Sequence, residues 1–214
     1  MDLEPVMRIS SGAAILFQGD SITDAERTRW KKHDLGNGYV MMVAERFFAK
    51  HPEANVSFLN RGESGNRIRD LRKRWQKDCL NLKPDIVSVL IGVNDTLGTF
   101  FLGRPTSIES FEEDYACILS LTRNNLDAQI VLLEPFLLPL SKEQMVLRLD
   151  IDARIKVVRK LAKEFDTLLV QLDSVFSQAA KKMPLEFWST DGVHPTHAGH
   201  ELIAESWLNN MNST

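Results

Sequence analysis

Residues 14–21 have the sequence AILFQGDS, which gives the first indication of the fold class. Four consecutive apolar side chains (14–17) are followed, after one polar residue, by the turn-forming residues Gly19, Asp20 and Ser21. A short apolar run closed by turn residues predicts a strand that is buried on both faces. Strands of this kind belong to parallel sheets that carry helices on both sides. We therefore expect several more such strands, separated by helices.

Four further segments have the same apolar character, and helical patterns lie between them. The alternation of strands and helices predicts an α/β fold, a three-layer α/β/α sandwich around a five-stranded parallel sheet. No linker interrupts the alternation, so residues 1–214 are expected to form a single domain. The predicted strands are residues 14–18, 55–60, 85–91, 129–134 and 167–171. The predicted helices are residues 38–50, 67–80, 107–124, 141–165, 174–182 and 195–210.

The composition excludes several classes of protein. Of 214 residues, 43% are hydrophobic and 26% are charged, which is the balance of an ordinary globular chain. The net charge of −3 gives no overall basic field, so no nucleic-acid partner is expected. The densest basic stretch, residues 67–77, is interrupted by acidic side chains and predicts the solvated face of a helix.

The sequence also predicts the compartment. No apolar stretch reaches the ~18 residues of a membrane span, so no membrane association is expected. Residues 1–11 lack the basic start and apolar run of a secretory signal. Two cysteines, Cys79 and Cys117, are too few for a disulfide framework and are expected to be buried thiols. These features together favour the cytoplasm.

Polar blocks follow the predicted strands where ligands bind in such folds. In open parallel sheets, ligands bind at the carboxyl ends of the strands. We expect four blocks of sequence to converge on that edge. They are Gly19-Asp20-Ser21 after the first strand, residues 60–66 after the second, Gly92-Val93-Asn94-Asp95 after the third, and Asp191-Gly192-Val193-His194-Pro195 before the last helix.

These blocks contain the groups that acyl transfer needs. A serine such as Ser21 needs a base to become a nucleophile, and His194 is a candidate for that base. Asp191, three residues earlier, is placed to orient the imidazole and to stabilise its charged form. The oxyanion of a tetrahedral intermediate needs hydrogen-bond donors. The backbone N–H groups of Ser21 and Gly65 and the side-chain amide of Asn94 are candidates.

The four blocks resemble those of the SGNH hydrolase superfamily, also called GDSL esterases or lipases, from about residue 14 to residue 207. The resemblance implies a flavodoxin-like SGNH hydrolase fold and a serine esterase that works without a metal or an organic cofactor. It also implies a catalytic triad of Ser21, Asp191 and His194. The oxyanion hole that it implies consists of Ser21, Gly65 and Asn94.

A narrower similarity concerns the bacterial SGNH acetylxylan esterases. It rests on GDSITD (19–24), LGNGYV (35–40), SGNRIRDLRKRW (64–75), IGVND (91–95) and DGVHPTHAGH (191–200). Members of that branch deacetylate carbohydrates and can form large homo-oligomers. The resemblance therefore implies removal of acetyl groups from xylo-oligosaccharides or similar sugars, with a homo-oligomer as the expected assembly. The sequence departs from that branch at Thr96-Leu97 and at Thr190, which leaves the substrate open.

Three alternatives to a carbohydrate deacetylase remain. The first is a hydrolase of small-alcohol or lipid esters, similar to isoamyl-acetate hydrolases or lysophospholipases. The second is a non-catalytic sugar-binding module, and the third is a metal-binding protein. A metal site at His194, His197 and His200 is disfavoured, because His194 belongs to the loop before the helix that carries the other two.

Candidate substrate contacts come mainly from aromatic side chains. The connection between residues 19 and 38 is long for a strand-to-helix loop and is expected to form a wall of the site. It contains Trp30, for which a subunit interface is an equal alternative. Phe136 and Trp188 are further candidates, with core packing favoured for Phe136, and Asp20 is a fourth. The expected partner is a small ester or an acetylated sugar.

Overall fold

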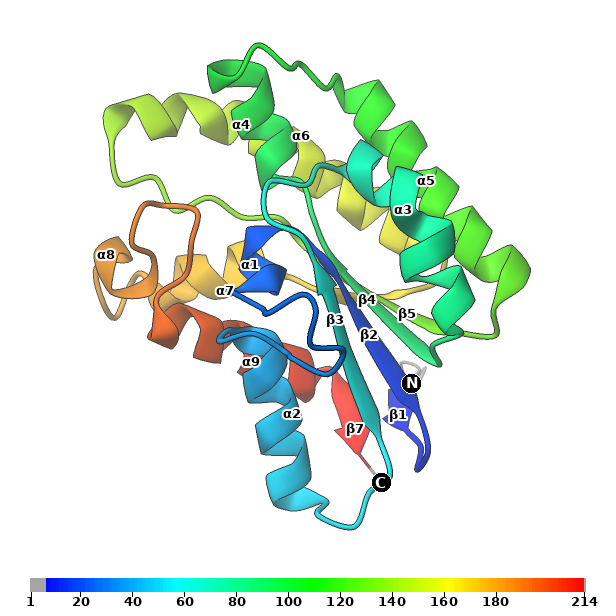
Figure 1. Ribbon diagram of the computed structural model, residues 1–214. Coiled ribbons are helices and arrows are strands. Elements are labelled where there is room, and N and C mark those ends of the chain that lie inside the picture. The colour runs from blue at the N-terminus through cyan, green and yellow to red at the C-terminus, as the bar shows by residue number, and fades with distance from the viewer. Residues whose placement is uncertain (1–6, 214) are drawn as a thin grey trace, which may run out of the picture.

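A computed structural model describes residues 7–213, and a five-stranded sheet forms its centre (Figure 1). The strand order is β3-β2-β4-β5-β6, and every neighbouring pair is parallel. The predicted parallel sheet is therefore confirmed. The strands are β2 (Ala14–Gly19), β3 (Ser57–Gly62), β4 (Ile86–Leu90), β5 (Gln129–Leu133) and β6 (Leu168–Val170).

Helices cover both faces of this sheet, which completes the predicted three layers (Figure 1). Helices α2 (Tyr39–Lys50) and α9 (His197–Asn209) pack together on one face. The other face carries α3 (Ile68–Asp78), α5 (Ile108–Asn125) and α6 (Lys142–Glu164). The α/β fold class predicted from the sequence is confirmed.

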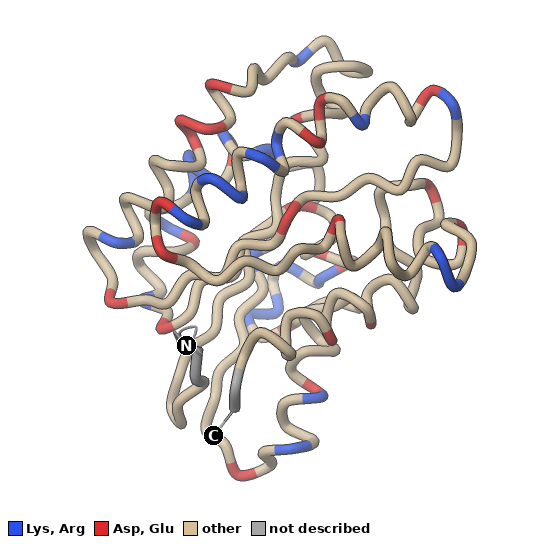
Figure 2. The backbone as a smooth tube through the Cα atoms, turned by 180° about the vertical axis from the view of Figure 1, so that it is seen from behind, with Lys and Arg blue, Asp and Glu red and all other residues tan. Residues whose placement is uncertain are grey.

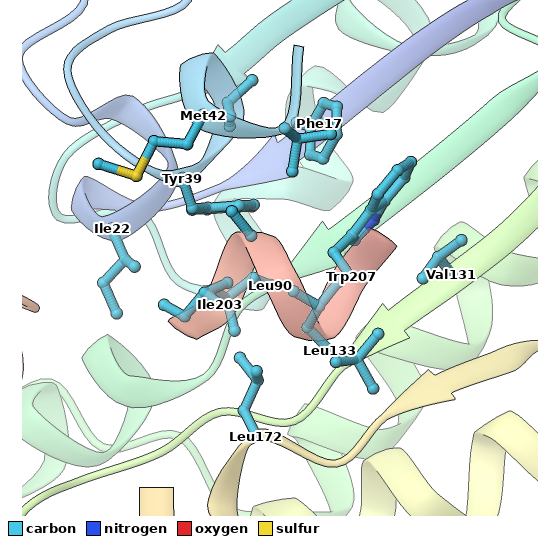
Figure 3. Packing of buried hydrophobic residues seen from close by; sticks show 14 of the residues in the cluster. Phe17, Ile22, Tyr39, Met42, Leu90, Val131, Leu133, Leu172, Ile203 and Trp207 are labelled. Atoms are coloured by element: carbon cyan, nitrogen blue, oxygen red, sulfur yellow. The ribbon is translucent and has the colours of Figure 1, made fainter. Parts of the chain in front are cut away.

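The three central strands, β2, β4 and β5, are mostly apolar, and almost all of their residues are buried. In β2, Ile15 and Phe17 contribute to the core beneath α2 and α9, whereas Leu16 contributes to the core beneath α3 and α5. Phe17 and Trp207 of α9 pack with ring centroids 5.2 Å apart in the first of these cores (Figure 3). The indole N–H of Trp207 donates to the Ser88 hydroxyl (3.1 Å), which satisfies a polar residue in the middle of the sheet.

The structure differs from the prediction at the boundaries of one strand and one helix, because of strand pairing and helix capping. The second strand was predicted at residues 55–60 but occupies Ser57–Gly62, because its polar end stays paired with β2 as far as Gly19 opposite Gly62. The last helix begins at His197 and not at Pro195, because the Thr196 side chain caps it by accepting from the N–H of Gly199 (3.2 Å).

Several short elements have no counterpart in the sequence prediction. Near the site are α1 (Ser21–Asp24), α4 (Val93–Phe101) and α8 (Leu185–Trp188). The short helix predicted at 174–182 begins earlier, as α7 (Leu172–Ala179), and a 3₁₀ turn η1 (Leu80–Leu82) follows α3. A separate parallel pair, β1 (Met7–Ile9) and β7 (Met211–Ser213), joins segments from the two ends of the chain.

Residues of both charge signs are interspersed along the helices (Figure 2). Ion pairs join the outer helices: Arg72 on α3 pairs with Asp114 on α5 (2.6 Å), and Lys160 on α6 pairs with Glu112 on α5 (2.6 Å). No helix among residues 7–213 is long and apolar enough to cross a membrane. Most of the segment 1–11, on which the prediction of no secretory signal rests, lies outside the described residues.

Candidate active site

Ser21 lies at the carboxyl edge of the sheet, where β2 turns sharply into α1 (Figure 1). The turn is tight: a Cβ at Gly19 would come within 2.2 Å of the Thr23 hydroxyl and 2.5 Å of the Leu90 carbonyl. Only glycine fits there. The Asp20 side chain caps α1 by accepting from the N–H of Ile22 (3.0 Å). The sequence Gly-Asp-Ser therefore fixes the position of the serine through packing and capping.

Asp191 organises the loop that carries His194. One carboxylate oxygen, Oδ1, accepts from the backbone N–H groups of Val193 (2.9 Å) and His194 (2.7 Å). The other, Oδ2, lies 2.6 Å from Nδ1 of the His194 ring. Gly192 allows the turn, since its φ is +86°. The same side chain thus shapes the loop and contacts the imidazole.

The two loops meet at a hydrogen bond between Ser21 and His194. Ser21 Oγ lies 2.9 Å from His194 Nε2. With Nδ1–H directed at Asp191, Nε2 of the neutral ring is left as the acceptor for the serine proton. Partial burial raises the pKa of Asp191, but the hydrogen bonds from the His194 backbone, the His194 ring and Val193 outweigh it, so the pKa lies below its ordinary value. This geometry can support nucleophilic attack by serine.

Donors for an oxyanion stand at the same edge. The N–H groups of Ser21 and Gly65 have no protein acceptor within residues 7–213. Asn94, in the first turn of α4, donates one Nδ2 hydrogen to the Asn66 carbonyl (3.1 Å), and its second Nδ2 hydrogen is left to donate to an oxyanion. Gly65 has φ +80° and no atom within 4 Å of an added Cβ, so its backbone conformation is what demands glycine.

Side-chain hydrogen bonds tie the donor loops together. Asp95 Oδ2 accepts from the N–H of Ile68 (3.1 Å), which joins α4 to the start of α3, where the loop after β3 ends. Asp24 Oδ2 accepts from the N–H of Ser64 (3.3 Å) in the same loop. Asn60 donates to the carbonyls of Thr23 (2.6 Å) and Leu35 (2.8 Å). The blocks predicted to converge are therefore linked, and the loop that carries Gly65 is held from two sides.

A cavity of about 460 Å³ opens beside the Ser21–His194 pair. Seven of the ten residues that line it are polar or charged, and they come from α1, the following loop, the Gly65 loop, the His194 loop and α9. The lining residues are Ser21, Ile22, Asp24, Ala25, Glu26, Asn37, Ser64, His194, Pro195 and His200.

Two candidate substrate contacts are buried: Phe136 packs in the core, as favoured from the sequence, and the prediction for Asp20 is wrong. Phe136 is fully buried and packs against Phe176 with ring centroids 4.4 Å apart, because its side chain falls on the core side of the segment after β5. Asp20 is only 1% exposed, because its carboxylate turns inward to cap α1. Neither side chain is available to a substrate.

The two tryptophans lie outside this cavity. Trp30 is 87% exposed and does not line it. Trp188 is half-buried, donates to the Met183 carbonyl (3.3 Å) and faces a separate hollow beside α7. The long loop does form a wall, as predicted, but through Glu26 and Asn37. The glycines on either side of Asn37 were the available sequence signal for this close packing.

Buried carboxylates surround the site. Burial raises the pKa of Asp20 to about 7; the Ile22 N–H and His194 oppose the rise, whereas Asp95 adds to it. Burial likewise raises the pKa of Asp95 to about 6, against the opposing effect of Arg154. Both carboxyl groups therefore hold protons in a pH range where exposed carboxyl groups are ionised.

Two histidines near the site, His194 and His200, are hydrogen-bonded to protein groups. Both ring nitrogens of His194 have partners, and Nδ1 of His200 accepts from the N–H of Tyr39 (3.1 Å). Across residues 7–213, no group of three or more His, Cys, Asp or Glu side chains is arranged to hold a metal ion. Cys79 is buried and Cys117 is partly buried, and both are free thiols.

Residues 17–202 match the GDSL-like lipase/acylhydrolase family, and the chain belongs to this family. It is a carboxylic ester hydrolase, as its sequence motifs predicted. It is 35% identical over 209 residues to an acetylxylan esterase of Geobacillus stearothermophilus, an alignment that covers 94% of this chain and 95% of that relative.

Solved structures agree with this assignment. Axe2, the acetylxylan esterase from Geobacillus stearothermophilus, superposes with a TM-score of 0.87 at 33% identity, covering 95% of this chain and 96% of that one. Catalytic mutants of Axe2 replace a serine, an aspartate or a histidine by alanine. LAE5, an α/β hydrolase enzyme from the metagenome of Lake Arreo, superposes with a TM-score of 0.88 at 31% identity, covering 94% and 96% of the two chains.

Proposed function

We propose that this enzyme removes acetyl groups from O-acetylated carbohydrates such as xylo-oligosaccharides, through a Ser21–His194–Asp191 triad. The observation that carries the proposal is the 2.9 Å contact between Ser21 Oγ and His194 Nε2, backed by Asp191 at 2.6 Å and open to a cavity lined by seven polar or charged residues. The similarity to an acetylxylan esterase over nearly the whole chain supports acetyl esters as the substrates.

The first half of the reaction forms an acyl-enzyme. Ser21 Oγ attacks the ester carbonyl carbon while its proton passes to His194 Nε2. Asp191 stabilises the imidazolium that results. The carbonyl oxygen becomes an oxyanion and accepts hydrogen bonds from the N–H groups of Ser21 and Gly65 and from the Asn94 amide.

The intermediate then collapses. The bond between the carbonyl carbon and the sugar oxygen breaks, and His194 gives its proton to that oxygen, so the sugar leaves as an alcohol. The acetyl group remains on Ser21. Water attacks it by the same route, with His194 as the base, and acetate is released with Ser21 restored. Each proton transfer is served by a residue of this chain, so the proposed cycle requires no metal or organic cofactor.

The cavity wall favours a hydroxylated substrate over a lipid. Only Ile22, Ala25 and Pro195 contribute apolar side chains to it. A long acyl chain would have to lie against carboxylate and amide groups and would leave them without hydrogen-bond partners.

We also propose that the chain acts as one catalytic domain, because Ser21 and His194 are 173 positions apart and share one hydrogen bond.

A substrate panel tests the proposal. The value of kcat/KM should be highest for acetylated xylobiose, lower for acetate esters of simple alcohols such as isoamyl acetate, and lowest for long-chain p-nitrophenyl esters. A tenfold preference for isoamyl acetate or for a long-chain ester would contradict the carbohydrate assignment. Lack of hydrolysis of every ester would contradict the enzymatic function and favour a binding module.

A further inference from the structure

Three segments that are distant in the sequence form one wall of the active-site cavity. They are residues 24–26, residues 36–38 and His200, and each contributes side chains to the lining. The N–H of Asn37 donates to the Ala25 carbonyl (2.8 Å), which joins the first two segments. The polar wall is therefore built from defined contacts and is not a loose loop.

Two glycines make this close packing feasible. A Cβ at Gly36 would lie 2.4 Å from the Asp24 carbonyl oxygen. A Cβ at Gly38 would lie 2.6 Å from the Cβ of Ala25 and 2.8 Å from Cε1 of His200. Both separations are too short for any side chain, so the three segments touch only because these positions are glycine.

The backbone that presents Glu26 is strained. Ala25 and Glu26 have φ values of 42° and 62°, so two consecutive residues with side chains adopt the left-handed region. Arg27 is buried and stabilises the turn. Its guanidinium donates to the Gly62 carbonyl (2.9 Å), and its Nε lies 3.5 Å from Oδ1 of Asp24. Strain of this kind persists where the surrounding structure enforces it, and it often marks a functional position.

Glu26 and Asn37 keep unused hydrogen-bonding capacity. The one side-chain contact between them is Asn37 Nδ2 to Glu26 Oε2, at 3.3 Å. No lysine, arginine or histidine of residues 7–213 lies within ion-pair distance of the Glu26 carboxylate. The carboxylate therefore has free acceptor positions, and the Asn37 amide has a free acceptor and a free donor.

His200 supplies a donor of fixed protonation state. Its Nδ1 accepts from the N–H of Tyr39, so the proton of the neutral ring is on Nε2. Burial, together with the charges of His197 and His194, lowers the pKa of His200 to about 4. Nε2 has no protein partner among the described residues and is not sealed from solvent, and the ring lines the cavity.

We propose that Glu26, Asn37 and His200 form a subsite that binds hydroxyl groups of the sugar from which the acetyl group is removed. Each sugar hydroxyl both donates and accepts, and the wall offers an acceptor, a mixed donor and acceptor, and a donor. A simple alkyl alcohol would satisfy none of these groups and would desolvate the Glu26 carboxylate without replacing its water. The subsite rests on the proposed deacetylation of carbohydrates and identifies the residues that recognise the sugar.

The test compares acetylated xylobiose with p-nitrophenyl acetate, whose leaving group carries no sugar hydroxyls. Glu26→Ala and Asn37→Ala should each lower kcat/KM for acetylated xylobiose about tenfold or more, largely by raising KM. The ratio of kcat/KM for the sugar to that for p-nitrophenyl acetate should fall at least about fivefold. The matched control is Glu53→Ala, an exposed glutamate in the loop before β3, at the opposite edge of the sheet, and its ratio should match that of the wild type.

The outcomes separate the two proposals. If the wild type hydrolyses both esters but the ratio is unchanged in the Glu26 and Asn37 variants, the subsite is wrong and the carbohydrate function stands. If the wild type hydrolyses p-nitrophenyl acetate but not acetylated xylobiose, the carbohydrate function is wrong and the subsite with it. Should Glu26→Ala not fold, Glu26→Gln keeps the shape and one acceptor and should give a smaller fall in the same ratio.

Discussion

Two carboxyl groups stand close to the Ser21–His194 pair, and their surroundings are opposite. The Asp191 side chain is 52% exposed and accepts three hydrogen bonds. Asp20 is almost completely buried, accepts from the N–H of Ile22, and has an unpartnered Oδ2. The pKa of Asp191 lies below its ordinary value, whereas burial raises that of Asp20 to about 7. Hydrogen bonding, not burial, is what keeps a carboxylate ionised here.

This difference assigns the two groups to different tasks. An ionised carboxylate that contacts Nδ1 suits the stabilisation of an imidazolium, which is the role proposed for Asp191. A second buried carboxyl group, that of Asp95, adds to the rise in the pKa of Asp20. Its structural task is to cap α1 and so to place Ser21. Proximity to the catalytic pair does not by itself identify the acid of a triad.

The largest expected effect separates the two carboxyl groups by their contribution to catalysis. Asp191→Asn should lower kcat for p-nitrophenyl acetate about 10³–10⁴-fold, because the amide no longer stabilises the protonated ring. Asp20→Asn keeps an acceptor for the Ile22 N–H and should cost less than about tenfold. Steady-state kinetics of the two variants measure this, and equal losses would contradict the distinction.

A smaller effect is expected from loss of one oxyanion donor. Asn94→Ala should lower kcat about 10²–10³-fold with little change in KM, because the amide acts on charge that develops in the transition state. The same assay measures it. A variant with wild-type kcat would remove Asn94 from the mechanism and leave the Asp191 comparison intact.

The buried carboxyl group, Asp20, should affect the pH dependence of the free energy of unfolding. Because the pKa of Asp20 is raised in the folded state, folded protein holds this proton longer than unfolded protein, and the Asp20 contribution to stability falls as pH rises from about 4 to about 7. Asp20→Asn removes this loss. Relative to the wild type it should therefore gain on the order of 1–4 kcal/mol between pH 4 and pH 8.

Urea unfolding of both proteins across that pH range gives the difference in their free energies of unfolding. The sign is opposite for Asp191, whose lowered pKa contributes stability that is lost as pH falls through the acidic range. A difference between wild type and Asp20→Asn that stays constant from pH 4 to pH 8 would show that Asp20 ionises as an ordinary carboxyl group.

The smallest effect concerns the exposed donor loop. Gly65→Ala places a Cβ in open space but at φ +80°, so the expected loss is about 1–2 kcal/mol of stability and less than about tenfold in kcat/KM. The melting temperature and the p-nitrophenyl acetate assay measure the two quantities. A loss as large as that of Asn94→Ala would mean that the loop moves when its backbone is strained.

The central strands and the Asp191–His194 pair could be predicted because local sequence determines them. The apolar run at residues 14–17 contributes to the cores on both faces of the sheet, and Asp191 lies three residues from His194 within one loop. Ser21 could be placed beside them because the carboxyl ends of parallel strands share one edge of the sheet. The same logic missed α4 (Val93–Phe101), whose sequence VNDTLGTFF contains a glycine and β-branched residues that weaken the helical signal. The pair β1 and β7 was missed because its two strands come from opposite ends of the chain.

Burial of single polar residues could not be predicted. Asp20 and Asp191 are both acidic residues in turn sequences, and only the elements packed around them make one buried and the other exposed. The same limit explains the cavity wall. The sequence favoured Trp30 as a substrate contact because it is aromatic. In the structure, close packing at Gly36 brings Glu26 and Asn37 to the cavity instead.

In the proposed reaction, Ser21 attacks the ester and carries the acetyl group. Mass spectrometry of enzyme mixed with p-nitrophenyl acetate and rapidly quenched in acid tests it directly. The Asp191→Asn variant, slowed in deacylation, should gain the mass of one acetyl group on the peptide that contains Ser21, and Ser21→Ala should gain none. An acetyl group on another residue, or turnover of the ester by Ser21→Ala at the wild-type rate, would contradict it.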